Sequence, residues 1–374
     1  MAHAYTPGLR VTGHTVIEKM RRLPLKGEVL VEKGDEVTAE DVVAKTALPG
    51  NVHAVNVANV LGLPPEDVKA CMLKREGDAV EKGEPIAVSK SFFGLFKSTA
   101  KASITGTVEL VSDITGQVTL REAPIPVEVH AYIDGTVTEV IEGEGVVVQA
   151  AGAQIQGIFG IGGERVGELA ILVNSPGESI GPDRLGDVRG KVVVVGAHAS
   201  YDLIFKARDQ GAVAIVAGGI SDADLKKILG YDLGVAITGS EEIGVTVVVT
   251  EGFGELAIAK KTFDLLQSLV GHKVSVNGAT QIRAGVMRPE ILVPLPANRG
   301  KIAVADHFGS GLEVGTLIRI IRQPAFGKLG KVTELPPDLS VVDSGARVRV
   351  LKARLEEEGT EVTVPRANVE MIEG

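Results

Sequence analysis

Three side chains of the kinds that perform nucleophilic catalysis lie close together in the middle of the chain. They are His198, Ser200 and Asp202, which are the residue types of a nucleophile triad. Ser200 does not lie in a GxSxG turn, however, and closeness in sequence does not supply the geometry of proton transfer. Cys71, the only cysteine, excludes an internal disulfide and a cysteine-based zinc site. We predict no catalytic residues and no metal site, and we favour a binding role over an enzymatic one.

A wider set of polar residues and glycines follows a series of expected strands. Ligands of open α/β sheets bind beyond the carboxyl ends of the strands, and helix N-termini there attract small anions. Turns also favour glycine, serine and asparagine for purely structural reasons, so ordinary loop chemistry is the alternative. The candidate ligand residues are His198, Ser200, Gly218, Gly219, Thr250, Glu251, Gly252 and Asn277.

The elements that would position this set alternate between strands and helices. KVVVVGA, from Lys191, is a continuous apolar run typical of a strand that is buried on both faces. A helix capped by Ser200 follows, and then come strand AVAIVAGG, helix DADLKKIL, strand VTVVVTE, a long helix and strand KVSVN. This alternation predicts a small α/β domain with a mostly parallel sheet over residues 186–285.

The N-terminal region contains an internal repeat. Gly34-Asp35 and Gly77-Asp78 begin matching segments, in which Val37 matches Val80 and Ala44 matches Ala87. Each Gly-Asp pair predicts a tight turn between strands, and the Gly-Thr-Val strings at Gly106 and Gly135 each predict a strand that leaves a bend. The pattern resembles the barrel-sandwich hybrid fold of biotinyl and lipoyl domains, which also occurs in RNA polymerase subunits and Rnf-type electron-transport subunits. We expect such a β domain, with a short helical insert, over residues 1–185.

A carrier role in such a fold would require a lysine at the tip of a hairpin. The expected MKM or DKA signature is missing, and the nearest candidates are Lys90 and Lys97 in SKSFFGLFKS. We therefore predict a structural role and no cofactor. The apolar run with Phe92, Phe93 and Phe96 is either a core plug or an exposed docking patch.

The most specific motif lies near the C-terminus, where Gly315 to Val332 reads GTLIRIIRQPAFGKLGKV. It resembles a KOW element, as found in the SH3-like barrels of NusG-type transcription factors and of ribosomal proteins. After a connector over 286–312, we expect an SH3-like barrel over 313–374. The resemblance implies RNA or protein binding, with candidate contacts Arg319, Arg322, Phe326, Lys328, Lys331 and Arg366.

The charge of the chain argues against a simple RNA-binding face. Residues 311–374 contain nine Lys and Arg against ten Asp and Glu, and the whole chain has a net charge of −9. Phosphate binding needs a local excess of positive charge. Docking of a protein partner, or packing within the chain, is therefore the alternative use of these cations.

Composition sets the overall expectation. Many short valine-rich runs separated by glycine predict a multidomain, β-rich α+β protein. No apolar stretch approaches the ~20 residues of a membrane span, so we expect a cytoplasmic protein without membrane contacts. The leading hypothesis is an adaptor or accessory factor of transcription or translation that binds a macromolecule through the KOW-like module. The alternatives are a small-ligand binder or enzyme that uses the middle domain, and a component of a large assembly.

Overall fold

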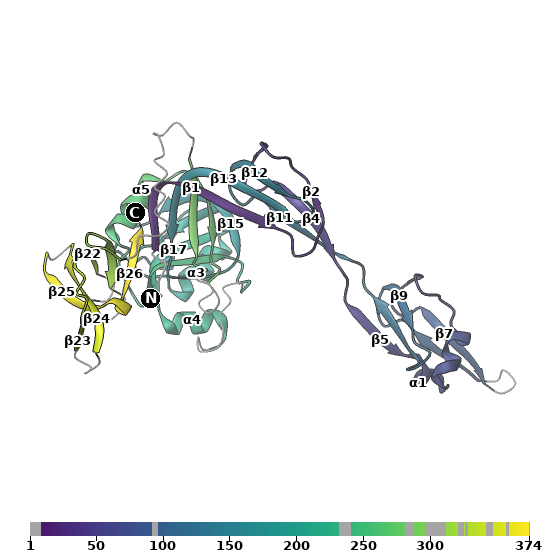
Figure 1. Cartoon of the computed structure of the whole chain (residues 1–374). Helices are drawn as coiled ribbons and strands as arrows, with labels where there is room; N and C mark the ends of the chain where they lie inside the picture. Colours follow the sequence, from purple (N-terminus) through teal and green to yellow (C-terminus); the bar gives the residue numbers. More distant parts are fainter. Residues whose placement is uncertain are drawn as a thin grey trace.

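A computed structural model describes residues 9–91, 96–231, 241–280, 287–295, 312–320, 325, 328–341, 347–356 and 359–373. The chain is elongated, and the described residues form four hydrophobic cores (Figure 1). We call the four parts the body (157–295), the proximal unit (9–50 and 122–156), the distal unit (51–121) and the C-terminal unit (312–373); the two long strands of the proximal unit also enter the body's core. Strands dominate every part, which confirms the β-rich expectation.

The body is an α/β sheet whose centre is parallel. Strands β15 (Glu164–Ile171), β16 (Lys191–Val194), β17 (Ala214–Ile220) and β18 (Thr246–Phe253) lie side by side in parallel. Between them run α3 (Tyr201–Asp209), α4 (Asp222–Leu229) and, after β18, α5 (Lys260–Ser268). Val192, Val193 and Val194 are fully buried, as the apolar run predicted.

Antiparallel strands complete the sheet on both sides. β14 (Phe159–Ile161) pairs with β18, β19 (Lys273–Asn277) pairs with β15, and β20 (Glu290–Pro294) pairs with β19. The sheet therefore starts well before residue 186, the predicted start of the α/β domain. β20 is one short strand in the described part of the expected connector; residues 296–311 of that connector lie outside the described residues.

Two long strands join the body to the proximal unit. β1 (Leu9–Arg22) pairs with β13 (Gly145–Gln156) along almost its whole length. On its other side, β13 pairs first with β12 (Gly135–Ile141) and then with β20 of the body. Because β1 and β13 belong to both parts, the proximal unit is a continuation of the body's sheet.

The proximal and distal units share one hydrogen-bonding plan. In the proximal unit the Gly34 amide donates to Val137 (2.8 Å) and the Val137 amide donates to Asp35 (2.9 Å). In the distal unit the same two bonds join Gly77, Val108 and Asp78, at 2.7 and 2.9 Å. Both glycines have a left-handed φ, of 100° and 94°. The predicted repeat is confirmed, because the matched Gly-Asp turns meet the matched Gly-Thr-Val strands.

The distal unit is inserted into a hairpin of the proximal unit. β4 (Val42–Leu48) pairs with β11 (Ile125–His130), and the chain between these strands forms the whole distal unit, which stands away from the body (Figure 1). Its strands are β5 (Val52–Asn56), β6 (Ala79–Val80), β7 (Pro85–Ser91), β8 (Phe96–Lys101), β9 (Gly106–Val111) and β10 (Gln117–Arg121). The proximal strands β2 (Glu28–Val29) and β3 (Glu36–Val37) pair with β4 and β12. The predicted 1–185 domain thus contains two separate cores.

The expected helical insert and hairpin both lie in the distal unit. The insert forms α1 (Val57–Leu61) and α2 (Val68–Cys71). Lys90 and Lys97 are opposite each other on β7 and β8, although their side chains, like that of Phe96, lie outside the described part. Phe92 and Phe93 are also outside the described residues.

The C-terminal unit consists of antiparallel strands around its own core. They are β21 (Leu317–Ile320), β22 (Leu329–Glu334), β23 (Leu339–Val341), β24 (Arg347–Leu355), β25 (Glu361–Pro365) and β26 (Val369–Glu373). Ile318, Val332 and Leu351 contribute to the core. β26 also pairs in parallel with the start of β1, which ties the two ends of the chain together. Among the described residues, no helix has the length and apolar character needed to cross a membrane.

Candidate functional site

The structure brings most of the predicted ligand residues to one edge of the parallel strands. His198, just after β16, forms a parallel bridge with Gly219 of β17. Gly219 in turn pairs with Gly252 of β18. Ser200 begins the helix that follows His198. These loops therefore lie together at the edge formed by the carboxyl ends of the parallel strands.

Asn277 does not belong to this edge, which corrects the prediction. β19 runs antiparallel to β15, so that Asn277 lies opposite Glu164, the first residue of β15. Since β15 is parallel to β16, the start of β15 marks the opposite edge of the sheet. The Asn277 side chain accepts a hydrogen bond from the Ala279 amide (2.9 Å) and shapes its own turn.

The two helix N-termini at the edge are occupied by side chains of the protein. Ser200 caps α3 and Ser221 caps α4 through bonds from the Leu203 and Asp224 amides, at 3.3 and 3.0 Å. The Asp224 carboxylate lies between the two helices, where it accepts bonds from the Tyr201 amide (3.1 Å) and the Ser221 hydroxyl (2.5 Å). Asp224 thus supplies the negative charge that we expected from a bound anion.

Asp224 also holds His198. The distance from His198 Nε2 to the Asp224 carboxylate is 3.3 Å, and His198 Nδ1 is buried without a hydrogen-bond partner among the described residues. Burial would raise the pKa of Asp224, but the bonds from Ser221 and Tyr201 and the nearby His198 outweigh it and hold that pKa below its usual value. The His198–Asp224 pair connects the loop after β16 to helix α4.

Two of the three predicted ligand glycines, Gly218 and Gly219, are covered by backbone. A Cβ on Gly218 would lie 1.8 Å from the Leu256 carbonyl oxygen, and a Cβ on Gly219 would lie 2.1 Å from that of Gly254. The covering segment is held by the Leu256 amide, which donates to Ala197 (3.1 Å). Glycine is required here for close backbone packing, and the space that a ligand would need is filled.

The two predicted sets of site residues meet in one buried ion pair. Glu251 of β18 lies 2.8 Å from Arg319 of β21, and the two side chains are only 4% and 2% exposed. Glu251 also accepts a bond from the Ala259 amide (2.9 Å), and Arg319 donates to the Thr250 carbonyl (3.0 Å). Arg319 was predicted to contact a partner and Glu251 a ligand. Both predictions need correction, because these residues bind each other and join the C-terminal unit to the body.

Most other predicted partner contacts also act within the chain. Arg366 donates to the Val350 and Pro336 carbonyls, at 3.1 and 2.8 Å, and so holds its own unit together. Lys328 is half-buried and already has an interaction partner. Lys331 is exposed and lies 4.0 Å from Glu356. Arg322 and Phe326 lie outside the described residues.

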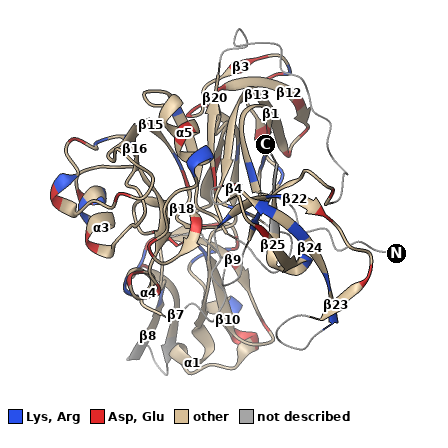
Figure 2. Ribbon diagram, turned by 90° about the vertical axis from the view of Figure 1, so that its left-hand side faces the viewer, with Lys and Arg blue, Asp and Glu red and all other residues tan. Residues whose placement is uncertain are grey.

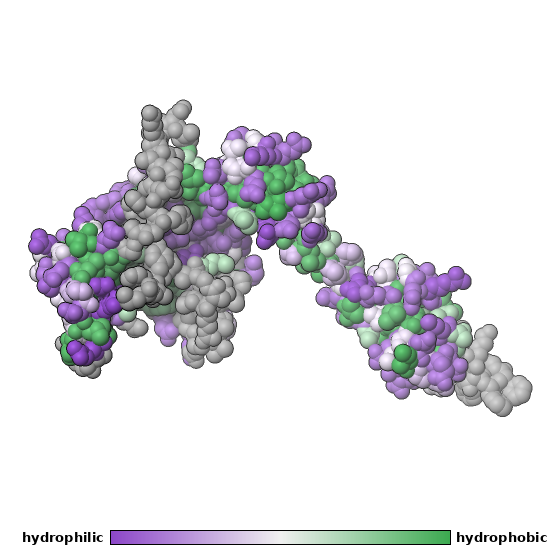
Figure 3. All heavy atoms as spheres, in the orientation of Figure 1, coloured by the Kyte–Doolittle hydropathy of each residue, from purple (hydrophilic) through white to green (hydrophobic). Residues whose placement is uncertain are grey.

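A surface that the sequence prediction missed lies on strands β23 and β24. Leu339 is directly opposite Arg349, and Val341 is directly opposite Arg347, so that the four side chains share one face. We call this face the ribbon face. Leu339 and Val341 are 52% and 69% exposed. Figure 2 shows Lys and Arg along β22 and β24, and Figure 3 shows apolar atoms at the outer end of this unit. The RVRV alternation was the available signal, but it does not say where the core ends.

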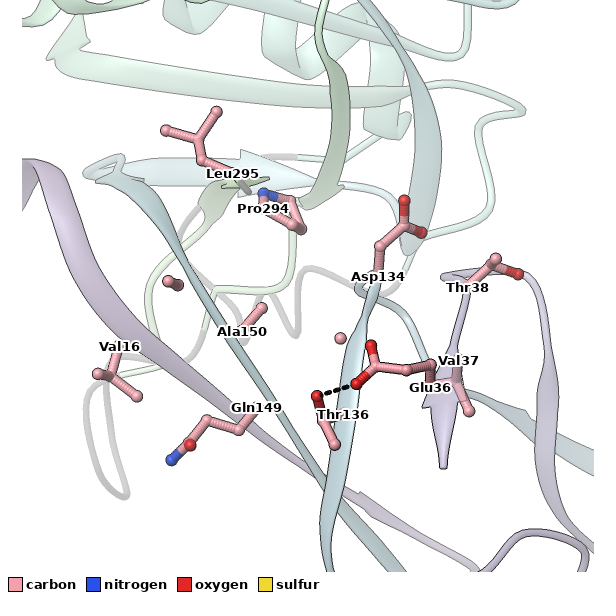
Figure 4. Close-up of a pocket in the computed structure, with 12 residues that line it drawn as sticks. Val16, Glu36, Val37, Thr38, Asp134, Thr136, Gln149, Ala150, Pro294 and Leu295 are labelled. Carbon is pink, nitrogen blue, oxygen red and sulfur yellow. Dashed lines mark hydrogen bonds between the residues drawn. The ribbon is translucent and has the colours of Figure 1, made fainter. Parts of the chain in front are cut away.

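A groove of about 750 Å³ lies at the point along β13 where its pairing with β12 ends and its pairing with β20 begins (Figure 4). Its polar lining includes Glu36, Asp134 and Thr136. The Thr136 hydroxyl donates to Glu36 (2.6 Å), while Asp134 accepts from the Ala39 amide and from Lys273, both at 2.7 Å. Both carboxylates are therefore already engaged in holding strands together.

A partly buried polar seam joins the proximal unit to the body. Tyr132 has the unusual φ of 72°, and its hydroxyl donates to Glu290 (3.4 Å), which also binds Lys19 (2.6 Å). The Arg21 guanidinium lies 5.2 Å from the centre of the Tyr132 ring and binds Glu164 through two bonds of 2.8 and 2.7 Å. Burial, with Glu290 nearby, raises the pKa of Tyr132 well above its usual value. The seam stabilises the junction of the two parts.

Comparison with known proteins gives no assignment: no protein-family model and no curated protein matches the chain.

Proposed function

We propose that the chain is a non-enzymatic adaptor or accessory factor that binds a macromolecular partner through its C-terminal unit. The observation that supports this most is the ribbon face, where two apolar side chains and two arginines point into solvent. Within the described residues, neither Arg347 nor Arg349 meets a carboxylate. Exposed apolar side chains that adjoin unpaired charges are typical of interaction surfaces.

The attachment of the C-terminal unit supports the same proposal. The Arg319–Glu251 pair and the β1–β26 pairing fix this unit to the body at two points on the neighbouring strands β21 and β26. A rigid attachment reduces the entropy lost on binding, since the surface needs no ordering. The unit is thus suited to hold a partner at a fixed position relative to the body and its projecting arm.

The parallel-sheet edge supports a binding role over a catalytic one. His198 binds Asp224, Glu251 binds Arg319, and two glycines of the edge are covered by backbone. The side chains that could have formed a reactive set are thus engaged in structural contacts. The resemblance of Gly315–Val332 to a KOW element favours a partner from transcription or translation, either a protein or an RNA.

The proposal is tested by isolating the partner and mapping its footprint. Tagged full-length protein is used to capture partners from an extract of its own cells, with and without ribonuclease. The captured molecule is then purified and added back, and hydrogen exchange is measured over the whole chain. We expect slower exchange within residues 312–373. Slower exchange only in the distal unit or at the parallel-sheet edge would contradict the proposal, as would a failure to reconstitute any complex.

A further inference from the structure

We infer that β23 is the docking edge for an extended, acidic and partly apolar segment of a protein partner, which adds to it as a further strand. This inference rests on the proposed function and names the chemistry of its partner. The site consists of the β23 edge together with the ribbon face of Leu339, Val341, Arg347 and Arg349.

β23 has an open edge. Within the described residues, it pairs with β24 alone. An edge strand presents backbone N–H and C=O groups that another chain can pair with, and proteins protect such edges with lysine, proline or bulges. β23 is a short edge of three residues, Leu-Ser-Val, and contains no lysine, proline or bulge.

The ribbon face beside this edge continues the core-facing side of β24. Side chains alternate between the two faces of a strand, so Arg347 and Arg349 lie on the same face of β24 as Leu351 and Ala353, which face the core of the unit. β24 therefore extends beyond that core, and its core-side face continues into solvent. There it joins the exposed side chains of Leu339 and Val341. A sheet face that continues from a core without cover is completed when another strand supplies side chains for it.

The charge of the ribbon face complements an acidic segment. Arg347 and Arg349 have no carboxylate partner within the described residues, although acidic residues are abundant in this unit. By contrast, Lys352 on the same strand binds Glu334 (2.6 Å). Acidic side chains on an added strand would reach the two arginines, and apolar ones would pack on Leu339 and Val341. Strand addition uses this combination of backbone bonds and alternating side-chain contacts.

The same features favour a peptide over a nucleic acid. Two arginines beside two aliphatic side chains form a narrow amphipathic strip, whereas phosphate binding depends on many cations acting together. The unit as a whole has nine basic and ten acidic residues between 311 and 374. Nor does the ribbon face contain an aromatic side chain on which a base could stack.

The test uses defined probes and the full-length protein. A fluorescein-labelled dodecapeptide of alternating valine and glutamate is titrated with the protein, and fluorescence anisotropy is measured. Three comparison probes are the valine–lysine counterpart, the valine–glutamate peptide N-methylated at every residue, and a twelve-nucleotide oligouridine. We expect binding of the first probe only, because N-methylation removes the strand-pairing donors and lysine reverses the charge.

Variants of the protein assign the binding to the ribbon face. We expect the double variant R347E/R349E to weaken binding of the acidic peptide by about tenfold, because two attractions become repulsions. R354E is the matched control, since Arg354 is an exposed arginine of the same strand on the opposite face, and it should leave binding unchanged. L339S/V341S should also weaken binding. Circular dichroism verifies that each variant is folded.

Each outcome has a distinct meaning. The inference is supported if the acidic peptide binds, if R347E/R349E weakens this binding while R354E does not, and if the peptide slows hydrogen exchange in 338–341. The inference would be overturned if R347E/R349E and R354E bound the acidic peptide equally well, or if the N-methylated peptide bound as tightly as the unmodified one. Binding of oligouridine alone would also overturn it. If a natural partner protects other residues of 312–373 while the peptides fail, only the inference about β23 is wrong. If its footprint lies outside 312–373, the proposed function fails as well.

Discussion

Removing either member of the Arg319–Glu251 ion pair should loosen the C-terminal unit from the body. The two side chains are almost fully buried, so R319M leaves a carboxylate without its countercharge, and E251L leaves a buried guanidinium. Breaking such a pair from one side costs about 3–5 kcal/mol. Arg319 Nε is buried with no hydrogen-bond partner among the described residues, which adds a cost to the native arrangement. The double variant R319M/E251L should therefore be about as stable as the native protein.

Hydrogen exchange measures this prediction locally, which matters because a chain with several cores has no single unfolding free energy. For segments of β21 and β18, each single variant should speed exchange by about two to nearly four orders of magnitude, since 1.36 kcal/mol corresponds to tenfold. The double variant should restore slow exchange. K352M, which removes an exposed pair of the same unit, is the control and should change exchange little. Single variants that change exchange less than about tenfold would refute the reasoning.

Three further predictions concern the body and its junction with the proximal unit. The folded pKa of Asp224 lies below its unfolded value, so the ionised carboxylate stabilises the native protein above about pH 4 and this stabilisation is lost as pH falls further. D224N lacks the carboxylate. Its stability to urea should therefore fall less steeply below pH 4 than that of the native protein. Folding raises the pKa of Tyr132, so the contribution of its protonated hydroxyl to stability is complete below about pH 10 and is lost at higher pH. Absorbance titration at 295 nm should show one tyrosine that ionises only when the protein unfolds. Y132F should lack this tyrosine signal. G218A should lower the melting temperature, because its Cβ would collide with the Leu256 carbonyl, whereas G181A, whose Cβ meets open space, should not.

The parts that the sequence predicted well are those governed by local pattern. Val192–Val194 form a buried parallel strand because a continuous apolar run fits a strand covered on both faces. Gly34 and Gly77 occupy matched turns because both need a left-handed φ that other residues avoid. The convergence of His198, Gly219 and Gly252 follows from strand direction, which the strand–helix alternation predicts.

The parts that could not be predicted depend on contacts between distant segments. Alternation in β21 indicates one core face, but Arg319 on the other face is buried because the body covers it. The sequence prediction placed Asn277 at the wrong edge of the sheet, because a local pattern does not distinguish an antiparallel strand such as β19 from a parallel one. Asp224, in the first turn of α4, occupies the place of the expected anion, and an acidic residue there is equally typical of ordinary helix capping.

The most direct test of the central claim is site-specific photo-cross-linking in living cells of the source organism. A benzophenone side chain is introduced at Val341 on the ribbon face and, as a control, at Val270 on the body, which is also exposed. We predict a discrete adduct with one protein from position 341 that R347E/R349E abolishes, and no such adduct from position 270. An adduct from position 270 alone, or an adduct from position 341 that the arginine variant leaves intact, would contradict the claim that the C-terminal unit receives the partner on this face.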